Sequence, residues 1–351
     1  MSFNGTLNRN KIQSALFNMI ISQDIIGGSI KANYNLVDKA RVDGSLYGDT
    51  KLYIDTPTLV SVPWDQDSDE ARNLLAISRP EAPKTQAITM DVFRQCMITK
   101  DAYLSKQAFS TEGVFSAYQS ILDSRLSKTK EVYDNTTYNA FFGTVEGVKN
   151  VQVPLSEITA TGVEKTRLEA EMIAQSVADL ISDMKDYGYE YTENGFLRAF
   201  GEEDIHVVWN TKYINKIRKV SLPNIYHKDG LMDKFGEDQL PSRFFGTVNA
   251  GSTQGNGTTI RSLIEQNIGS NHYFAGELIK SGDTAPAGTS YTTDENIICK
   301  VYTKLPPYMS AFNVATSFFN AKNLSTNMYQ TWGHNTLKAL DSEAIVVVHA
   351  N

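Results

Sequence analysis

The sequence predicts an α+β fold organised around one long amphipathic helix. Three observations indicate this. Within residues 110–142, apolar positions recur at steps of three or four. Strand-like alternation at residues 86–99 leads into this helix, and a buried strand at 204–209 leads into a second helix at 211–220, with Asn210 as its expected N-cap. The stripe of the long helix consists of Phe115, Tyr118, Leu122, Leu126, Thr129 and Tyr133.

The charges of the long helix agree with its direction. Glu112 lies in its first turn and Lys128 in its second half, where the helix dipole favours an anion and a cation respectively. From Glu112 to Asn135, at about 1.5 Å per residue, the helix would span roughly 35 Å. Because it has a single apolar stripe, we expect it to lie across a sheet rather than thread a core. Arg125, Lys128 and Lys130 are expected on its exposed side.

An extended, charged segment occupies residues 30–62, after a short amphipathic segment at 8–26. Turn chemistry at Asp43-Gly44 and Gly48-Asp49 interrupts its alternating stretches. Since this segment has charges of both signs and little apolar content, we expect an arm that lies on a neighbouring molecule. Its candidate contact residues are Lys39, Arg41, Asp43, Tyr47, Asp49 and Lys51.

The second half of the chain alternates structured and loop-rich stretches. Thr161 and Glu164 have capping-box spacing before a helix that ends at Gly188. The buried stripe of this helix is expected to be Leu168, Ile173, Val177, Leu180 and Met184. Glycine-rich runs at 246–259 and 280–293 predict surface loops. Strands are expected at 296–304 and 344–349, while the apolar stretch 311–319 fits either a strand or a helix.

Composition excludes several classes of protein. The chain has 351 residues and a net charge of −7, which argues against a dedicated nucleic-acid binder because phosphate neutralisation needs clustered Lys and Arg. Cys96 and Cys299 belong to no CxxC motif, so neither a disulfide framework nor a zinc site is indicated, and a reducing compartment fits best. No window approaches eighteen consecutive apolar residues, and we expect no membrane span.

Motifs for catalysis or metal binding are missing from the sequence. None of the five histidines has a partner at metal-ligand spacing. His206, inside an apolar strand, is expected to be a hydrogen-bonded structural residue, and the other four are expected at the surface. Phosphate loops and nucleophile elbows are also missing. We therefore predict a non-enzymatic protein with no catalytic, cofactor-binding or metal-binding residues.

The order of these segments resembles the major capsid protein of tailed bacteriophages, which has the Hong Kong 97 fold. An N-terminal arm, an extended loop, a strand, a long spine helix and an α/β region follow one another in that family. Residues 36–52 (LVDKARVDGSLYGDTKL), 91–94 (DVFR) and 103–108 (YLSKQA) are also similar to capsid proteins of short-tailed phages. Those of the crAss-like gut phages come closest.

The resemblance implies a division of the chain into parts. Residues 1–29 would form the N-terminal arm, and 30–83 the extended loop with its flanking segment. Residues 84–204 would form a peripheral domain that holds the spine helix. Residues 205–335 would form an axial domain, and 336–351 would return to the peripheral domain as a closing strand.

The resemblance also implies a mechanical function. Copies would form hexamers and pentamers through axial-domain contacts, with the extended loop across the adjacent subunit, and the icosahedral shell would hold double-stranded DNA without sequence specificity. Portal, scaffolding and head-decoration proteins would be partners, and the virion capsid would assemble in the bacterial cytoplasm. The residues leave alternatives open, namely an encapsulin-like cargo shell, a phage tail or adaptor protein, and a cytoplasmic α/β enzyme with an unrecognised site.

Overall fold

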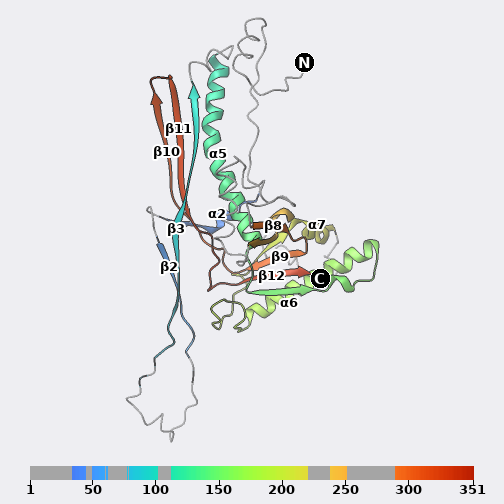
Figure 1. Cartoon of the computed structure of the whole chain (residues 1–351). Helices are drawn as coiled ribbons and strands as arrows, with labels where there is room; N and C mark the ends of the chain where they lie inside the picture. Colours follow the sequence, from blue (N-terminus) through green and yellow to red (C-terminus); the bar gives the residue numbers. More distant parts are fainter. Residues whose placement is uncertain are drawn as a thin grey trace.

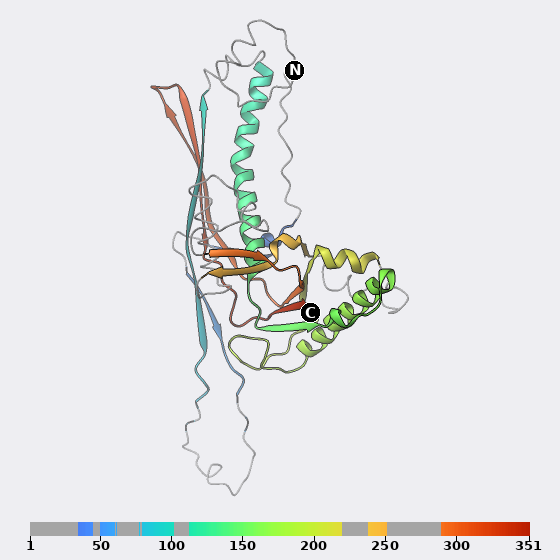
Figure 2. The ribbon, with the colours of Figure 1, turned by 45° about the vertical axis from the view of Figure 1, so that its right-hand side comes forward.

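Two β-sheets and one long helix organise the protein (Figures 1 and 2). The structure is a computed structural model, and it describes residues 34–44, 50–59, 61, 77, 79–101, 112–219, 238–250 and 289–351. The long helix, α5 (Glu112–Thr144), stands beside a tall sheet, and the second sheet lies near its C-terminal end (Figure 2).

The first sheet, here called the tall sheet, has the strand order β1-β10-β11-β3-β2. β1 runs parallel to β10, and the other three pairs are antiparallel. The register pairs Thr316 with Tyr329 and Tyr329 with Met97, so these three positions share one face. The strands are β1 (Arg41–Asp43), β2 (Thr50–Asp55), β3 (Lys84–Asp101), β10 (Tyr308–Asn320) and β11 (Ser325–Asn335).

The second sheet has the order β4-β12-β9-β5-β6, and α6 (Gly162–Lys185) and α7 (Thr211–Lys219) pack on it. Its strands are β4 (Lys149–Val153), β5 (His206–Asn210), β6 (Gln239–Leu240), β9 (Ile297–Tyr302) and β12 (Ile345–Ala350). A separate pair joins β7 (Gly246–Ala250) to β8 (Thr289–Thr293). The short helices are α2 (Leu36–Ala40), η1 (Leu155–Glu157) and η3 (Ser242–Phe244).

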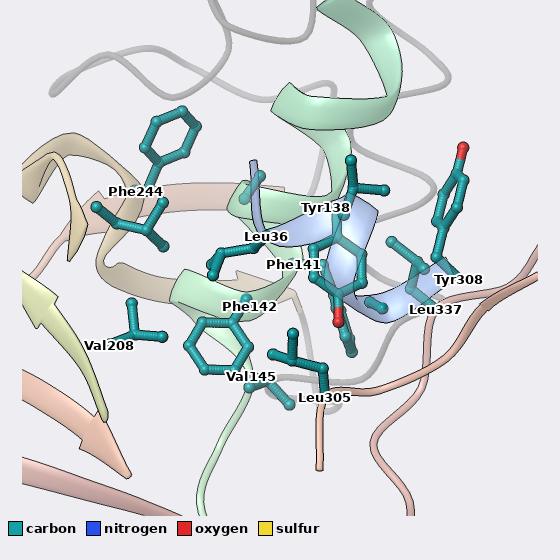
Figure 3. Close-up of a cluster of buried hydrophobic side chains, with 14 of the residues drawn as sticks. Leu36, Tyr138, Phe141, Phe142, Val145, Val208, Phe244, Leu305, Tyr308 and Leu337 are labelled. Atoms are coloured by element: carbon teal, nitrogen blue, oxygen red, sulfur yellow. The ribbon is translucent and has the colours of Figure 1, made fainter. Parts of the chain in front are cut away.

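The last turns of α5 lie in the main hydrophobic core. Tyr138, Phe141 and Phe142 are fully buried there, and Leu36 of α2 and Leu305 pack in the same cluster (Figure 3). A second core joins α6 to the face of the second sheet through apolar side chains such as Ile173, Val177 and Met184. The second sheet therefore packs on both faces: Val208 and Val347 lie in the main core, and Val207 and Val348 lie in the second.

The long helix differs from expectation at its C-terminal end. It continues to Thr144 instead of ending near Asn135, and its last turns thread the core rather than lie on a sheet. The reason is that apolar residues surround the helix axis there, so no single stripe can bury them all. Packing is so close that a Cβ on Gly143 would lie 1.8 Å from the carbonyl oxygen of Phe244.

Residues 36–43 are a second correction. This stretch was expected to be an arm with little apolar content, yet α2 buries Leu36, Val37 and Ala40 in the main core. β1 then pairs with β10. Within residues 50–89, called the β2–β3 arm below, β2 and the first part of β3 form an antiparallel pair.

The expected division into domains stays a prediction. The closing strand, β12, lies between β4, from the expected peripheral segment 84–204, and β9, from the expected axial segment 205–335. Conversely, β10 and β11, which fell within the expected axial segment 205–335, pair with each other and with β3. These pairings join strands far apart in sequence, and a strand pattern does not encode its partner.

The shorter elements follow the sequence closely. The strands expected near 86–99, 204–209, 296–304 and 344–349 are confirmed, and 311–319 belongs to β10. Asn210 caps α7, since its Oδ1 accepts the backbone N–H of Lys212 at 3.0 Å. Thr161 precedes α6 without a side-chain cap bond, so the expected capping box does not form. The outer ends of both glycine-rich runs pair as β7 and β8 instead of forming loops.

Candidate assembly surface

One face of the tall sheet, called the outer face, carries three rows of uncharged side chains. Across β10, β11 and β3 these rows are Val314-Thr331-Gln95, Thr316-Tyr329-Met97 and Phe318-Asn327-Thr99, and Asp101 lies at the end of the next row. Two hydrogen bonds join neighbouring strands within these rows, from Gln95 to Thr331 (3.1 Å) and from Thr99 to Asn327 (2.8 Å). On the β2–β3 arm the same face continues with Thr50, Leu52, Ile54, Thr85, Ala87 and Thr89.

The opposite face of the tall sheet, the inner face, holds charged residues. Arg94 Nε donates to Tyr133 of α5 at 3.4 Å, and Lys100 pairs with Asp123 of α5. Antiparallel sheets normally place apolar residues inward. The inner face follows this rule, since Ile88, Val92 and Trp332 are buried there beside these two charged residues, while the outer face exposes threonines and apolar side chains.

Large apolar side chains on this outer face are exposed. Relative exposures are 58% for Leu52, 61% for Ile54, 76% for Met97, 48% for Val314 and 63% for Phe318. These side chains lie in two groups, one on the β2–β3 arm and one on the three long strands, and each group is a candidate interaction site. Leu59 and Ile77 add two further exposed apolar side chains beyond the paired part of the β2–β3 arm.

The root of the β2–β3 arm is anchored to the body of the subunit. Asp55, only 5% exposed, pairs with Arg198 and accepts a hydrogen bond from Asn194 Nδ2 at 2.7 Å. Lys84 Nζ donates to the Asn194 carbonyl at 2.7 Å, and Gln86 bonds the backbone near β12 at the Ala339 carbonyl (2.7 Å). These contacts set the direction in which the arm leaves the body.

A buried polar cluster joins α5 to β1 and β10. The carboxylate of Asp134 is fully buried, and it accepts hydrogen bonds from Tyr308 (2.6 Å), Lys130 (2.5 Å) and Arg41 (3.4 Å). Burial raises the pKa of Tyr308 well above its usual value, so its hydroxyl stays protonated and donates. Three donors thus offset the cost of a buried charge.

Two residues in and beside this cluster correct expectations. Lys130 was expected on the exposed side of the helix but is buried against Asp134, one turn further on. His334 was expected at the surface but is buried: its Nδ1 donates to the Asn335 carbonyl (2.8 Å) and its Nε2 lies 3.0 Å from the Tyr133 hydroxyl. His206 is instead exposed and lies beside the ring of Tyr302.

Lys300 is a further buried charged residue, and the sequence pattern did not indicate its burial. It lies in β9, and its Nζ donates to the carbonyls of Phe142 (2.9 Å), Gly143 (2.9 Å) and Val145 (2.7 Å) at the end of α5. These carbonyls have no partner within a helix, and a cation suits this end of the helix dipole. The lysine therefore links the long helix to the second sheet.

The six candidate contact residues lie in different environments. Lys39 pairs with Asp238 at 2.6 Å and Arg41 with Asp38 at 3.0 Å, so both bond within the subunit. Asp43 is exposed, and its carbonyl accepts from Lys51. Tyr47 and Asp49 lie outside the described residues. The exposed apolar residues of the outer face were missed, although the period-two pattern in β2 could have indicated them.

The described ranges hold no group of three or more His, Cys, Asp or Glu side chains that could bind a metal. In the same part of the chain, no helix is both long and apolar enough to cross a membrane. Cys299 is fully buried, Cys96 is partly buried, and burial raises the pKa of both thiols.

Comparison by sequence finds no protein-family model and no curated protein that matches this chain. Comparison by structure finds extensive matches. A chain in "Capsid structure of Staphylococcus phage Andhra" is 9% identical, with a TM-score of 0.66, over 95% of this chain and 88% of that one. A chain in "Structure of head fiber and inner core protein gp22 of native bacteriophage P68" is 10% identical, with a TM-score of 0.63, over 95% and 91%.

A third match, at a TM-score of 0.52 and 10% identity, is a chain in "Capsid structure of the Cyanophage P-SCSP1u", over 96% of this chain and 94% of that one. These likenesses span nearly the whole of every chain involved. The protein therefore has the α+β fold of bacteriophage capsid chains, the Hong Kong 97 type.

Proposed function

We propose that this chain is the major capsid protein of a tailed bacteriophage, which assembles into hexamers and pentamers of an icosahedral shell. The observation that carries the proposal is the fold likeness to the Andhra capsid chain, which covers 95% of this chain and 88% of that one. Because the match covers nearly the whole of both chains, the proposal concerns an entire shell subunit, rather than one domain of a protein with another function.

The surface of the subunit supports this function. The uncharged rows of the outer face, with their exposed apolar groups, suit burial against other copies, and the anchored β2–β3 arm suits a contact across a subunit boundary. The net charge of −7 suits a shell that encloses double-stranded DNA without binding it tightly. No described feature asks for catalytic chemistry, so the proposed function is structural.

The proposal extends to partners and place. Portal, scaffolding and head-decoration proteins would bind the assembled shell, and assembly would take place in the bacterial cytoplasm. The tall sheet with α5 would form the peripheral part of the subunit, and the second sheet would form the axial part. The similarity to capsid proteins of crAss-like phages stays a prediction from the residues at 36–52, 91–94 and 103–108.

The direct test is assembly of the purified chain. Size-exclusion chromatography and negative-stain microscopy are expected to show shells, sheets or ring-shaped capsomers. A small monomer whose melting temperature rises with a metabolite would contradict the proposal and favour an enzyme. A gene lying beside portal and terminase genes would favour a phage capsid over an encapsulin-like cargo shell.

A further inference from the structure

We propose that Asn194 is a site of spontaneous deamidation, and that its conversion to aspartate or isoaspartate permanently loosens the root of the β2–β3 arm. The inference concerns the chemistry of this chain alone, so it goes beyond the proposed function and does not depend on it. Asn194-Gly195 is the one Asn-Gly pair within the residues that the structure describes.

An Asn-Gly pair reacts without an enzyme. The backbone nitrogen of Gly195 bonds to Cγ of Asn194, the bond from Cγ to Nδ2 breaks, and the proton of the Gly195 amide passes through water to the leaving nitrogen, which departs as ammonia. Water then opens the resulting succinimide ring at either carbonyl and yields aspartate or isoaspartate. Glycine favours the first step because it has no Cβ to shield its nitrogen. With φ at +68°, Gly195 is also in a conformation that other residues rarely adopt.

Water has access to this pair. Asn194 lines a small hollow at the root of the arm, together with Asp55, Lys84 and Asp341. The Asn194 side chain is half-buried, and Gly195 is exposed. The water that opens the succinimide can therefore enter here, and ammonia can leave.

Native hydrogen bonds engage both reacting groups and restrain the reaction. Nδ2 of Asn194 donates to the Asp55 carboxylate at 2.7 Å, and the Gly195 N–H donates to the Thr192 carbonyl at 3.0 Å. The backbone N–H of Asn194 donates to the Asp341 carbonyl at 3.1 Å. Ring closure must break the first two bonds, so it requires a local opening of the root. The rate of deamidation should measure how often that opening occurs.

The product cannot restore the native contact. Asp55 is only 5% exposed and already pairs with Arg198. A carboxylate at position 194 has no N–H to donate, and it places a second negative charge beside Asp55. Isoaspartate also adds a methylene group to the main chain before Gly195, which displaces the turn. Because β2 ends at Asp55, the change acts directly on the root of the arm.

Ageing of the folded full chain in mildly alkaline buffer tests the reaction. Peptide mass spectrometry measures aspartate and isoaspartate at position 194. We expect both products, formed at least about tenfold more slowly than in the denatured chain. Asp55→Ala and Lys84→Met each remove a contact of Asn194 and should speed the reaction in the folded chain. Asp179→Ala, at an exposed carboxylate of α6, is the matched control and should leave the rate unchanged.

Asn194→Asp reproduces one product and tests its effect on the arm. Hydrogen exchange of the β2 amides (Thr50–Asp55) should become at least about tenfold faster, while exchange in β9 (Ile297–Tyr302) should stay unchanged. Asn150→Asp makes the same change at an exposed position of β4 and is the matched control. It should leave the exchange of β2 unchanged.

Three results would overturn the inference. The first is no product at position 194 in the folded chain after ageing that converts the denatured chain. The second is an equal rate in the wild type, Asp55→Ala and Lys84→Met, and the third is unchanged β2 exchange in Asn194→Asp. None of these measurements requires shells, so their failure would leave the capsid proposal standing. A chain that deamidates as expected but forms no shell would contradict the capsid proposal alone.

Discussion

Lys300 connects the end of α5 to the second sheet through a single nitrogen that donates to three backbone carbonyls. Lys300→Met keeps most of the side-chain volume but leaves those carbonyls without this donor. We expect a loss of about 2 kcal/mol in unfolding free energy, within the range for buried unsatisfied polar groups. Denaturant titration measures it. Lys304→Met, on an exposed lysine, is the control and should change little.

The same lysine should make stability depend on pH. Burial lowers the pKa of Lys300 from 10.5 to about 7. Between these values the unfolded chain binds a proton that the folded chain has released, and the neutral amine then keeps two N–H donors for the three carbonyls. By proton linkage, the contribution of Lys300 to stability grows as pH rises from 7 to 10.5 and is lost as pH falls through 7. The slope is at most about 1.4 kcal/mol per pH unit. Denaturant titrations at several pH values should show the unfolding free energy of the wild type rising relative to that of Lys300→Met as pH rises. A difference between the two proteins that does not change with pH would contradict this.

Tyr308 donates to the buried Asp134 carboxylate, and the hydroxyl can be removed without changing the ring. Tyr308→Phe is expected to lower the unfolding free energy by about 1–3 kcal/mol, because a buried charge loses one donor. Tyr329→Phe, on the outer face, is the matched control and should change stability by less than about 0.5 kcal/mol. Equal changes in unfolding free energy for the two substitutions would show that the Tyr308 hydroxyl does not stabilise the buried Asp134 carboxylate.

At the scale of the element, substitutions near the C-terminal end of α5 should cost more stability than substitutions in its N-terminal half. Phe141 is fully buried in the main core, while Leu122, in the half beside the tall sheet, is only partly buried. We expect Phe141→Ala to cost about 3–5 kcal/mol, and Leu122→Ala clearly less. A polar residue at Leu122 should impair folding first, and assembly only as a result. Thermal unfolding of both variants checks the order, and a larger cost at Leu122 would contradict it.

At the scale of the whole molecule, two deletions distinguish a segment needed for folding from a segment needed for assembly. Replacing residues 56–83 with Asn-Gly joins Asp55 to Lys84, which are paired partners, through a two-residue turn. This variant should fold and fail to form stable shells. Deleting residues 36–43 should unfold the subunit, because it removes Leu36, Val37 and Ala40 from the main core and β1 from the tall sheet.

Circular dichroism and negative-stain microscopy distinguish these outcomes. Shells from the shortened arm would show that the arm is not needed for assembly. A folded subunit after deletion of residues 36–43 would show that α2 contributes little to the core.

Local pattern alone predicted much of the molecule. Apolar periodicity and turn residues indicated α5, α6 and most strands, because the spacing of side chains on a helix or strand is a property of neighbouring residues. The order of elements indicated the capsid type of fold. The same reasoning failed where burial came from distant partners, as for His334, whose ring meets Tyr133 from 201 residues away in sequence.

Only the tertiary structure decided which strands pair and which face each sheet presents. Lys300 looks like an ordinary strand lysine until β9 meets the end of α5, more than 150 residues away in sequence. The six candidate contact residues at 39–51 stay a prediction, and the tertiary structure adds the outer face of the tall sheet as a second candidate surface. Exposure is a property of the assembled sheet, and a two-residue alternation cannot say which face will meet the core.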